Sequence, residues 1–453
     1  MRTLLGTCGL LGLSAVLGAC TADSDEVRPR ERELTFPTGI TVAPNDTVAM
    51  NATANSELRF DSGTITVLEL QTVQQVMDAW KTSGALPGEV CGEDNEPCCE
   101  PDPDRRETLT CDESLFIRGG ASVRIGNFAT DIAVQKLDEP NLRVFVPTRG
   151  DPSIAWADWD DARLSCSAGG DFALCDDDHR LSFVRNDGDQ PGLPEEPFGV
   201  FADSAGEFAM VTHLSSGAVT LIDSPKAGPV QITDVMTGVF AADPSGIRGA
   251  TGIVGRTPNQ PDDIVYVGSR SEDRIQTFTV GRPVNGAPPF LLPGTWFFLD
   301  AVGGNTGGSS DTRGMQFSPD GSRLYLVNRR PPSLQVIDTS LTATGFPANR
   351  PTGATDICRQ ASTVAVSGTG DAERAYVTCF QDGQIYVVDP RSGVLVEDIV
   401  VVGRGPYGVA PARSRDMLLV TNFLEDTVAV VDIAPGSATR NRVVLRIGRP
   451  KEL

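Results

Sequence analysis

The chain has 453 residues, a formal net charge of −22 at neutral pH and ten cysteines. A surface this acidic repels polyanions, so we exclude nucleic acid as a partner. With only two histidines in the sequence, a histidine-based metal site is excluded as well, and we expect no metal and no other cofactor. After the first twenty residues no segment has eighteen uninterrupted apolar residues, so no membrane-spanning helix is predicted there.

The N-terminal segment is typical of an export signal, because a short apolar stretch follows Arg2. The stretch ends in Leu-Gly-Ala-Cys at Cys20, which resembles a lipobox, where the cysteine thiol takes a diacylglycerol and becomes the new first residue. An ordinary signal peptide with a chance cysteine is the alternative. We predict a lipoprotein signal peptide over 1–19, a tether over 20–36, and a lipid anchor in the cell envelope. Thr21 stands where some bacteria place a retention aspartate, which favours the outer membrane.

Between residues 37 and 449, strand signals recur about every ten residues. Short runs of Val, Ile, Tyr and Thr alternate with Gly, Pro, Asn and Asp. A unit of three strands joined by two turns is clearest in "YGVAPARSRDMLLVTNFLEDTVAVVDI" and recurs as "GMQFSPDGSRLYLVNRRPPSLQVID". In six copies, ten positions separate the residue that closes the second strand from the one that closes the third: Arg149/Trp159, His213/Asp223, Arg270/Val280, Asn328/Asp338, Cys379/Asp389 and Asn422/Asp432. A copy beginning "GITVAPNDTVAMN" brings the number of units to seven.

These units resemble the YVTN repeat of seven-bladed bacterial β-propellers. The resemblance covers most of residues 38–447 and is closest in the last three units. It implies an all-β, seven-bladed β-propeller, and radially arranged sheets of this kind do bury a continuous core. A fold of two domains is the alternative. Some proteins of this fold are lactone hydrolases or subunits of quinone-dependent amine dehydrogenases, but no catalytic residue of those enzymes matches a position here.

Two insertions interrupt the repeat on what we expect to be one face. Residues 71–118 lie within the first blade, and residues 160–180 lie in the second. In many repeat proteins, insertions grouped on one face mark the binding side. An equal alternative is that these insertions, held by disulfides, only cover the lower face of the propeller. The first insertion opens with Val73, Val76 and Met77 at helical spacing, so a short helix is predicted near 70–82.

Eight cysteines remain beyond the signal segment, and an even number in an exported chain predicts four disulfides: Cys91, Cys98, Cys99, Cys111, Cys166, Cys175, Cys358 and Cys379. The blade register places Cys358 and Cys379 at one rim, so we expect them to bond. Adjacent cysteines rarely bridge each other, so Cys98 and Cys99 should pair separately with Cys91 and Cys111.

The closure of the ring has two alternatives. Val443–Ile447 could complete the last blade, or Glu33–Phe36 could pair there from the other end of the chain.

Candidate binding residues gather on the face that carries the second-to-third turns and the blade-to-blade loops, which we call the top face. Turns place four of them there and positions ahead of innermost strands place two more: Arg149, His213, Arg270, Arg329, Arg248 and Arg313. Guanidinium groups match carboxylates and phosphates, so these arginines predict an anion site at the channel mouth. Alternatively they form ion pairs with acidic residues of neighbouring blades.

Catalytic motifs are absent, since the sequence contains no GxSxG, HExxH or Walker-type loop. We therefore expect a monomeric, non-catalytic envelope lipoprotein whose propeller binds a protein, a peptide or an envelope polymer. The alternative is a lactonase-type hydrolase with its site at the channel mouth, using His213 and nearby carboxylates.

Replacement of Cys20 tests the anchor. Cys20→Ala removes the thiol that would carry the lipid, so the protein should leave the membrane fraction. Fractionation of cells after a high-salt wash measures this, with Cys8→Ala as the matched control that keeps the anchor. A Cys20→Ala protein that still sediments with membranes would refute the assignment.

Overall fold

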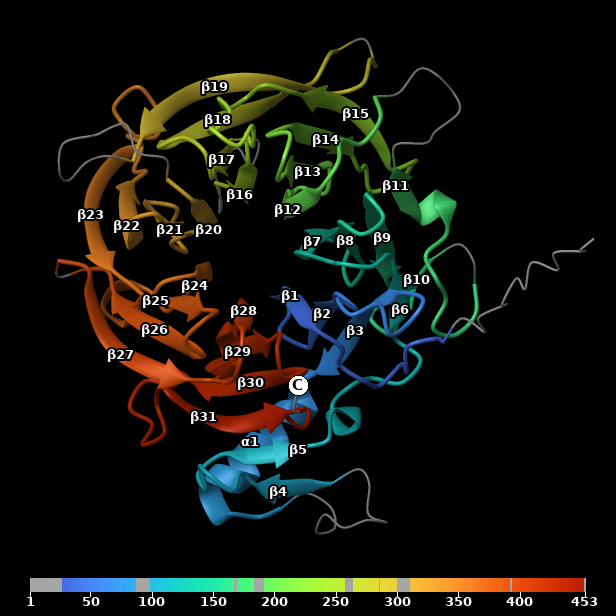
Figure 1. Ribbon diagram of the computed structural model, residues 1–453, viewed down its shortest axis with the longest axis vertical. Coiled ribbons are helices and arrows are strands. Elements are labelled where there is room, and N and C mark those ends of the chain that lie inside the picture. The colour runs from blue at the N-terminus through green and yellow to red at the C-terminus, as the bar shows by residue number, and fades with distance from the viewer. Residues whose placement is uncertain are drawn as a thin grey trace, which may run out of the picture.

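The computed structural model describes residues 27–86, 98–166, 169–182, 191–256, 264–284, 286–299, 310–391 and 393–451. Its strands form seven mainly antiparallel sheets, which stand as blades around a common axis (Figure 1). The predicted seven-bladed β-propeller is thereby confirmed. The predicted signal peptide and Cys20 lie outside the described residues.

Each blade takes its strands in chain order from the centre outward. The first three blades consist of β1 (Pro37–Val42), β2 (Val48–Thr53), β3 (Gly63–Glu69) and β6 (Val123–Ile125); β7 (Ala133–Lys136), β8 (Leu142–Thr148), β9 (Ser153–Trp159), β10 (Leu164–Ser165) and β11 (Arg180–Ser182); and β12 (Pro197–Ala202), β13 (Phe208–His213), β14 (Val219–Asp223) and β15 (Gln231–Met236).

The last four blades follow the same order. They consist of β16 (Ala250–Gly255), β17 (Val265–Ser269), β18 (Arg274–Gly281) and β19 (Phe290–Phe298); β20 (Thr312–Phe317), β21 (Arg323–Arg329), β22 (Pro332–Asp338) and β23 (Arg350–Asp356); β24 (Ala361–Ser367), β25 (Arg374–Cys379), β26 (Gln384–Asp389) and β27 (Leu395–Val401); and β28 (Pro406–Ala412), β29 (Met417–Asn422), β30 (Thr427–Asp432) and β31 (Arg442–Ile447).

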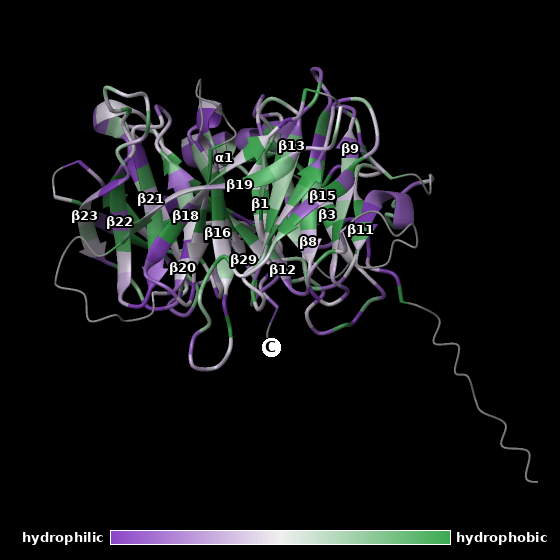
Figure 2. Ribbon diagram, turned by 90° about the horizontal axis from the view of Figure 1, so that it is seen from above, coloured by the Kyte–Doolittle hydropathy of each residue, from purple (hydrophilic) through white to green (hydrophobic). Residues whose placement is uncertain are grey.

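The core lies between the blades. The middle strands are buried on both faces, and β29 and β30 are buried along their whole length. Seen edge-on, the strands carry most of the hydrophobic colour, and the hydrophilic colour gathers in the loops of the two faces (Figure 2). Neighbouring sheets cover each other's apolar faces, so no blade is a separate core.

A two-residue β-bulge recurs near the start of the innermost strands. In β28 the pairing with β29 shifts between Pro406 and Val409, and five other blades shift at the same place. Thr421 of β29 fills this bulge: its hydroxyl accepts from the Gly408 N–H at 2.8 Å and donates to the Thr38 carbonyl of the first blade at 2.7 Å. One hydroxyl thus joins two strands of its own blade to the next blade.

Threonine hydroxyls at two kinds of position join neighbouring blades: Thr212, Thr378 and Thr421 stand on second strands, and Thr130 and Thr251 stand at the start of innermost segments. Five such bonds reach the innermost segment of the next blade: Thr130 to Phe198 (2.6 Å), Thr212 to Thr251 (2.9 Å), Thr251 to Thr312 (2.5 Å), Thr378 to Tyr407 (2.9 Å) and Thr421 to Thr38 (2.7 Å). The approach is so close that a Cβ at Gly408 would lie 2.4 Å from the Thr38 carbonyl oxygen. Any residue with a Cβ would clash with this oxygen, so the position requires glycine.

The helix and part of the first insertion pack against the outer edge of the last blade. Helix α1 (Leu70–Ser83) confirms the predicted helix and ends at Gly84, whose φ is 63°. Beyond it, β4 (Cys99–Pro101) and β5 (Leu109–Cys111) extend the sheet of the seventh blade, with β5 parallel to β31. Figure 1 shows these elements outside β31. An insertion of the first blade therefore belongs structurally to the last.

The first of the two closure hypotheses is confirmed, because β31 pairs with β30 and completes the last blade. The alternative segment pairs with no strand, although the Phe36 N–H donates to the Asp426 carboxylate at 2.6 Å. Two ion pairs add to the joint. Lys81 of α1 contacts the buried Asp432 at 2.6 Å, and the buried Arg446 contacts Asp102 at 2.7 Å.

Three disulfides lie within the described residues. The predicted bond between Cys358 and Cys379 is confirmed, with Cα atoms 5.8 Å apart. Cys99 bonds Cys111, as one of the predicted alternatives required, and Cys166 bonds Cys175. A pairing with Cys91 lies outside the described residues.

The bulge hydroxyl makes a testable contribution to stability. Thr421→Val keeps the shape but leaves the Gly408 N–H and the Thr38 carbonyl without their buried partner, which should lower the free energy of unfolding by about 1–3 kcal/mol. Urea unfolding measures the change. Thr342→Val, in an exposed loop, is the control and should be nearly neutral. Equal stability of the two variants would contradict the role given to the bulge.

Candidate functional site

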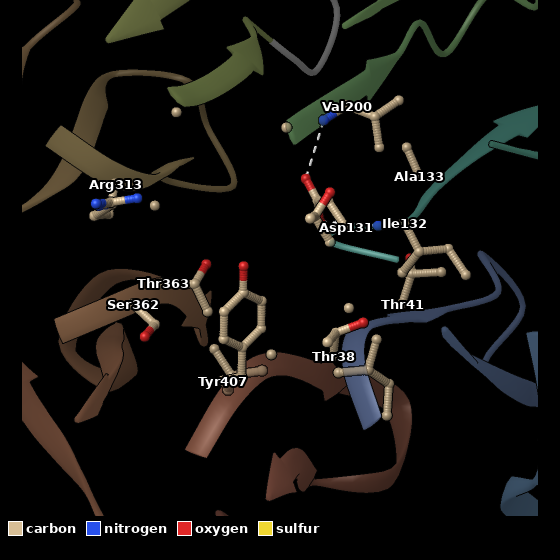
Figure 3. Close-up of a pocket in the computed structure, with 18 of the residues that line it drawn as sticks. Thr38, Thr41, Asp131, Ile132, Ala133, Val200, Arg313, Ser362, Thr363 and Tyr407 are labelled. Carbon is tan, nitrogen blue, oxygen red and sulfur yellow. Dashed lines mark hydrogen bonds between the residues drawn. The ribbon is translucent and has the colours of Figure 1, made fainter. Parts of the chain in front are cut away.

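The axis of the propeller contains a cavity of about 770 Å³. Its wall is formed by the innermost strands β1, β12, β16, β20, β24 and β28 and by residues at the start of the second blade. Side chains from several blades meet there, as Figure 3 shows for Thr38, Asp131, Thr363 and Tyr407. The cavity has the size of a small-molecule site.

Four of the predicted arginines line this cavity: Arg149, Arg270, Arg313 and Arg329. Two of them have acidic partners, since Arg149 pairs with Glu196 and Arg313 contacts Asp311 at 2.8 Å. Both hypotheses about these residues therefore hold in part: they line one cavity, and some of them form ion pairs.

The other two arginines make no ion pair within the described part of the chain. Arg329 donates through Nε to the Ala361 carbonyl at 2.6 Å and through Nη2 to the Ser362 hydroxyl at 3.2 Å, so it also joins the fifth blade to the sixth. Arg270 has a buried Nε without a hydrogen-bond partner. The cavity wall thus holds two guanidinium groups that form no ion pair in the described part of the chain, although Asp311 raises the pKa of Arg329.

The pKa of Arg329 reflects this concentration of charge. Burial, followed by the charge of Arg313 and to a smaller extent that of Arg270, lowers the pKa of Arg329 to about 10, although Asp311 acts in the opposite direction. A group of like charges that disfavours its own ionisation favours an anion placed among its members.

Two predicted binding residues lie elsewhere. His213 is fully buried; its ring nitrogens contact the Glu195 carbonyl at 3.1 Å and the Thr220 hydroxyl at 2.8 Å. Burial lowers its pKa to about 4, so the ring stays neutral. Arg248 is exposed and donates to the Phe240 carbonyl at 3.0 Å. Neither residue lines the cavity.

Aromatic side chains in the cavity wall were not among the predicted site residues. Phe128, Phe198, Tyr407 and Phe423 all line the cavity. Phe423 packs on Phe36 with ring centroids 5.3 Å apart. Burial, followed by the charge of Asp131, raises the pKa of Tyr407, so its phenol is neutral.

Asp131 is a carboxylate enclosed in the channel. It stands where five other blades have a glycine in the bulge: Gly39, Gly199, Gly252, Gly314 and Gly408. Its oxygens accept from the backbone N–H groups of Val200 at 3.0 Å and Ile132 at 2.9 Å, and Figure 3 shows the first of these bonds. Burial raises its pKa to about 6 despite these bonds.

Neither metal ligation nor a membrane span is evident in the described residues. They contain no group of three or more His, Cys, Asp or Glu side chains that could hold a metal ion. No helix among them is long and apolar enough to cross a membrane.

Comparison with known proteins supports the fold. No protein-family model matches the sequence, and no curated protein matches it. Among solved structures, a protein described as a candidate 6-phosphogluconolactonase from Bacteroides fragilis is 13% identical, with 92% of this chain and 99% of that chain covered and a TM-score of 0.54. The Cps50 (Swd1) β-propeller domain of Myceliophteria thermophila is 10% identical, with 91% and 99% covered and a TM-score of 0.53. At such identities the likeness shows the propeller fold alone.

The pKa of Asp131 makes stability depend on pH. Its folded value of about 6 exceeds the ordinary value of 3.8, so the folded state retains this proton to higher pH than the unfolded chain. As pH rises from about 4 to 6, the free energy of unfolding should therefore fall by up to about 3 kcal/mol at this group. Asp131→Asn should remove that part of the slope in urea unfolding measured from pH 4 to 7.

Asp243→Asn provides a contrast for this experiment. Hydrogen bonds from the Ser245 side chain hold the pKa of Asp243 below its usual value, so this carboxylate adds stability that is lost as pH falls. Its replacement should change the slope in the opposite sense. Identical slopes for the wild type and Asp131→Asn would show that Asp131 titrates normally.

Proposed function

We propose that this protein is a non-catalytic binding protein of the cell envelope, lipid-anchored through Cys20, which takes a carboxylate or phosphate group into the propeller channel. The observation that carries the proposal is the pair of guanidinium groups, Arg270 and Arg329, which line a cavity of about 770 Å³ and form no ion pair in the described chain. A protein with a net charge of −22 has carboxylates in excess, so arginines left unpaired in its channel favour an external anion.

Replacement of Arg270 tests the proposal. Arg270→Gln keeps a shorter, uncharged polar side chain and removes no ion pair, so it should weaken phosphate or carboxylate binding roughly 10- to 100-fold, the loss typical of a charge-assisted hydrogen bond. Arg270→Lys keeps the positive charge but lacks the forked guanidinium group, so its anion affinity should lie between those of the wild type and Arg270→Gln. Isothermal titration calorimetry with inorganic phosphate and acetate measures the affinities.

Arg350→Gln is the matched control, because Arg350 lies on the outer strand β23 with its side chain 72% exposed. It should bind anions as the wild type does. The proposal would be refuted if the wild type bound no anion, or if the wild type and Arg270→Gln bound anions with equal affinity.

A lactone hydrolase at the same site is the second candidate, and Asp131 is the observation that favours it. A channel carboxylate whose pKa is about 6 is ionised at neutral pH and suits a general base. Water would add to the lactone carbonyl, the ring C–O bond would break, and the hydroxy-acid product would present its carboxylate to the arginines. A lactone and ester screen from pH 5 to 8 decides: turnover that rises through about pH 6 and disappears in Asp131→Asn would establish this function.

A further inference from the structure

The bulge of the innermost strands sets which side chains face the channel. Its first residue lines the cavity in the six blades that have the bulge, and Thr130 lines it at the corresponding place in the second blade: Thr38, Thr130, Phe198, Thr251, Arg313, Ser362 and Tyr407. Four of the blades use a small hydroxyl residue here. Thr38 donates to the Ala52 carbonyl of its own blade at 3.0 Å, and Thr130 and Thr251 donate to carbonyl groups of the next blade. A threonine or serine at this position is therefore sufficient for the hydrogen bonds of the propeller scaffold.

Three blades depart from this rule. Phe198, Arg313 and Tyr407 put large side chains where a threonine would suffice, and Figure 3 shows the Tyr407 ring directed into the channel. Within the described residues, neither aromatic side chain makes a hydrogen bond. Side chains that exceed what the repeat needs, all at one position and all lining one cavity, indicate a ligand.

Aromatic and cationic groups line this cavity together. The Arg313 guanidinium lies over the Phe198 ring, 5.8 Å from its centroid. Phe423, from the turn after β29, is supported from behind by Phe36 and by Phe380, at centroid distances of 5.3 and 6.0 Å. Apolar ring faces thus lie beside guanidinium groups in one enclosed space.

We propose that the channel ligand is a small aromatic acid, whose ring packs against Phe198, Tyr407 and Phe423 while its carboxylate or phosphate contacts Arg270, Arg313 and Arg329. This rests on the proposed anion-binding function and adds the apolar part of the ligand. A cavity of about 770 Å³ holds such a molecule whole, whereas a polymer would need an open groove. Aromatic packing specifies the ring, and the arginine forks specify the acid.

The experiment compares each acid with and without its ring. Calorimetry with phenyl phosphate against inorganic phosphate, and with phenylacetate against acetate, gives two affinity ratios and separates phosphate from carboxylate ligands. In the wild type we expect at least one arylated probe to bind about tenfold more tightly than its ring-free partner, as burial of an aromatic ring implies.

The variants Phe198→Thr and Tyr407→Thr install the residue that other blades already hold at this position, so the bulge is preserved. Singly, each should reduce that ratio, and together they should bring it to about threefold or less. Phe346→Thr, on an outer loop with the side chain 70% exposed, is the control and should keep the ratio. Circular dichroism melting confirms that each variant is folded.

The outcomes distinguish the two proposals. Ratios near one in the wild type would overturn the aromatic ligand and leave anion binding in place. A tenfold ratio that persists in both single variants would overturn the assignment of Phe198 and Tyr407. Failure of all four probes to bind would remove the anion-binding function itself.

Discussion

The ring depends on a buried hydroxyl placed in a β-bulge. Thr421 satisfies the Gly408 N–H of its own blade and the Thr38 carbonyl of the next, so a single side chain settles the polar groups that the bulge leaves unpaired. The contact brings adjacent innermost strands so close that the second bulge residue at Gly408 must lack a Cβ. Five blades have glycine at this second position and two have Asp131 or Thr363, so most of the variation in channel chemistry falls on the first bulge residue.

Much of the fold was predictable because the spacing of a sequence repeat gives the positions of equivalent strands in successive blades. Ten-residue spacing placed the strands, helical spacing placed α1, and the position of Cys379 within its blade placed it against Cys358. The attachment of β5 to the seventh blade was not predictable. It is a short parallel pairing between Leu109–Cys111 and Leu445–Ile447, and no periodicity connects segments so far apart in sequence.

The candidate site was predictable in position and not in detail. Blade register placed Arg149, Arg270, Arg313 and Arg329 at one opening, and all four line the cavity. It could not show that Glu196 pairs with Arg149, or that the His213 ring is buried between the Glu195 carbonyl and Thr220, since these contacts depend on tertiary packing. The aromatic wall did leave a signal in the sequence: Phe198 and Tyr407 occupy the place that Thr38 and Thr251 hold in other blades, and this becomes visible once the bulge defines the alignment.

The electrostatics of the cavity destabilise the folded protein, and contacts elsewhere in the ring offset this loss of stability. Burial and like charges lower the pKa of Arg329, the buried Arg270 Nε has no hydrogen-bond partner among the described residues, and burial raises the pKa of Asp131. Each of these features reduces the stability of the empty channel, and sites built for ligands commonly carry such a cost. The compensation lies at a distance, where the joint between the seventh and first blades gains the Arg446–Asp102 and Lys81–Asp432 ion pairs and the added strand β5. Because the two unpaired arginines sit on the fourth and fifth blades, this joint can keep the ring closed without neutralising the charges that would hold an anion.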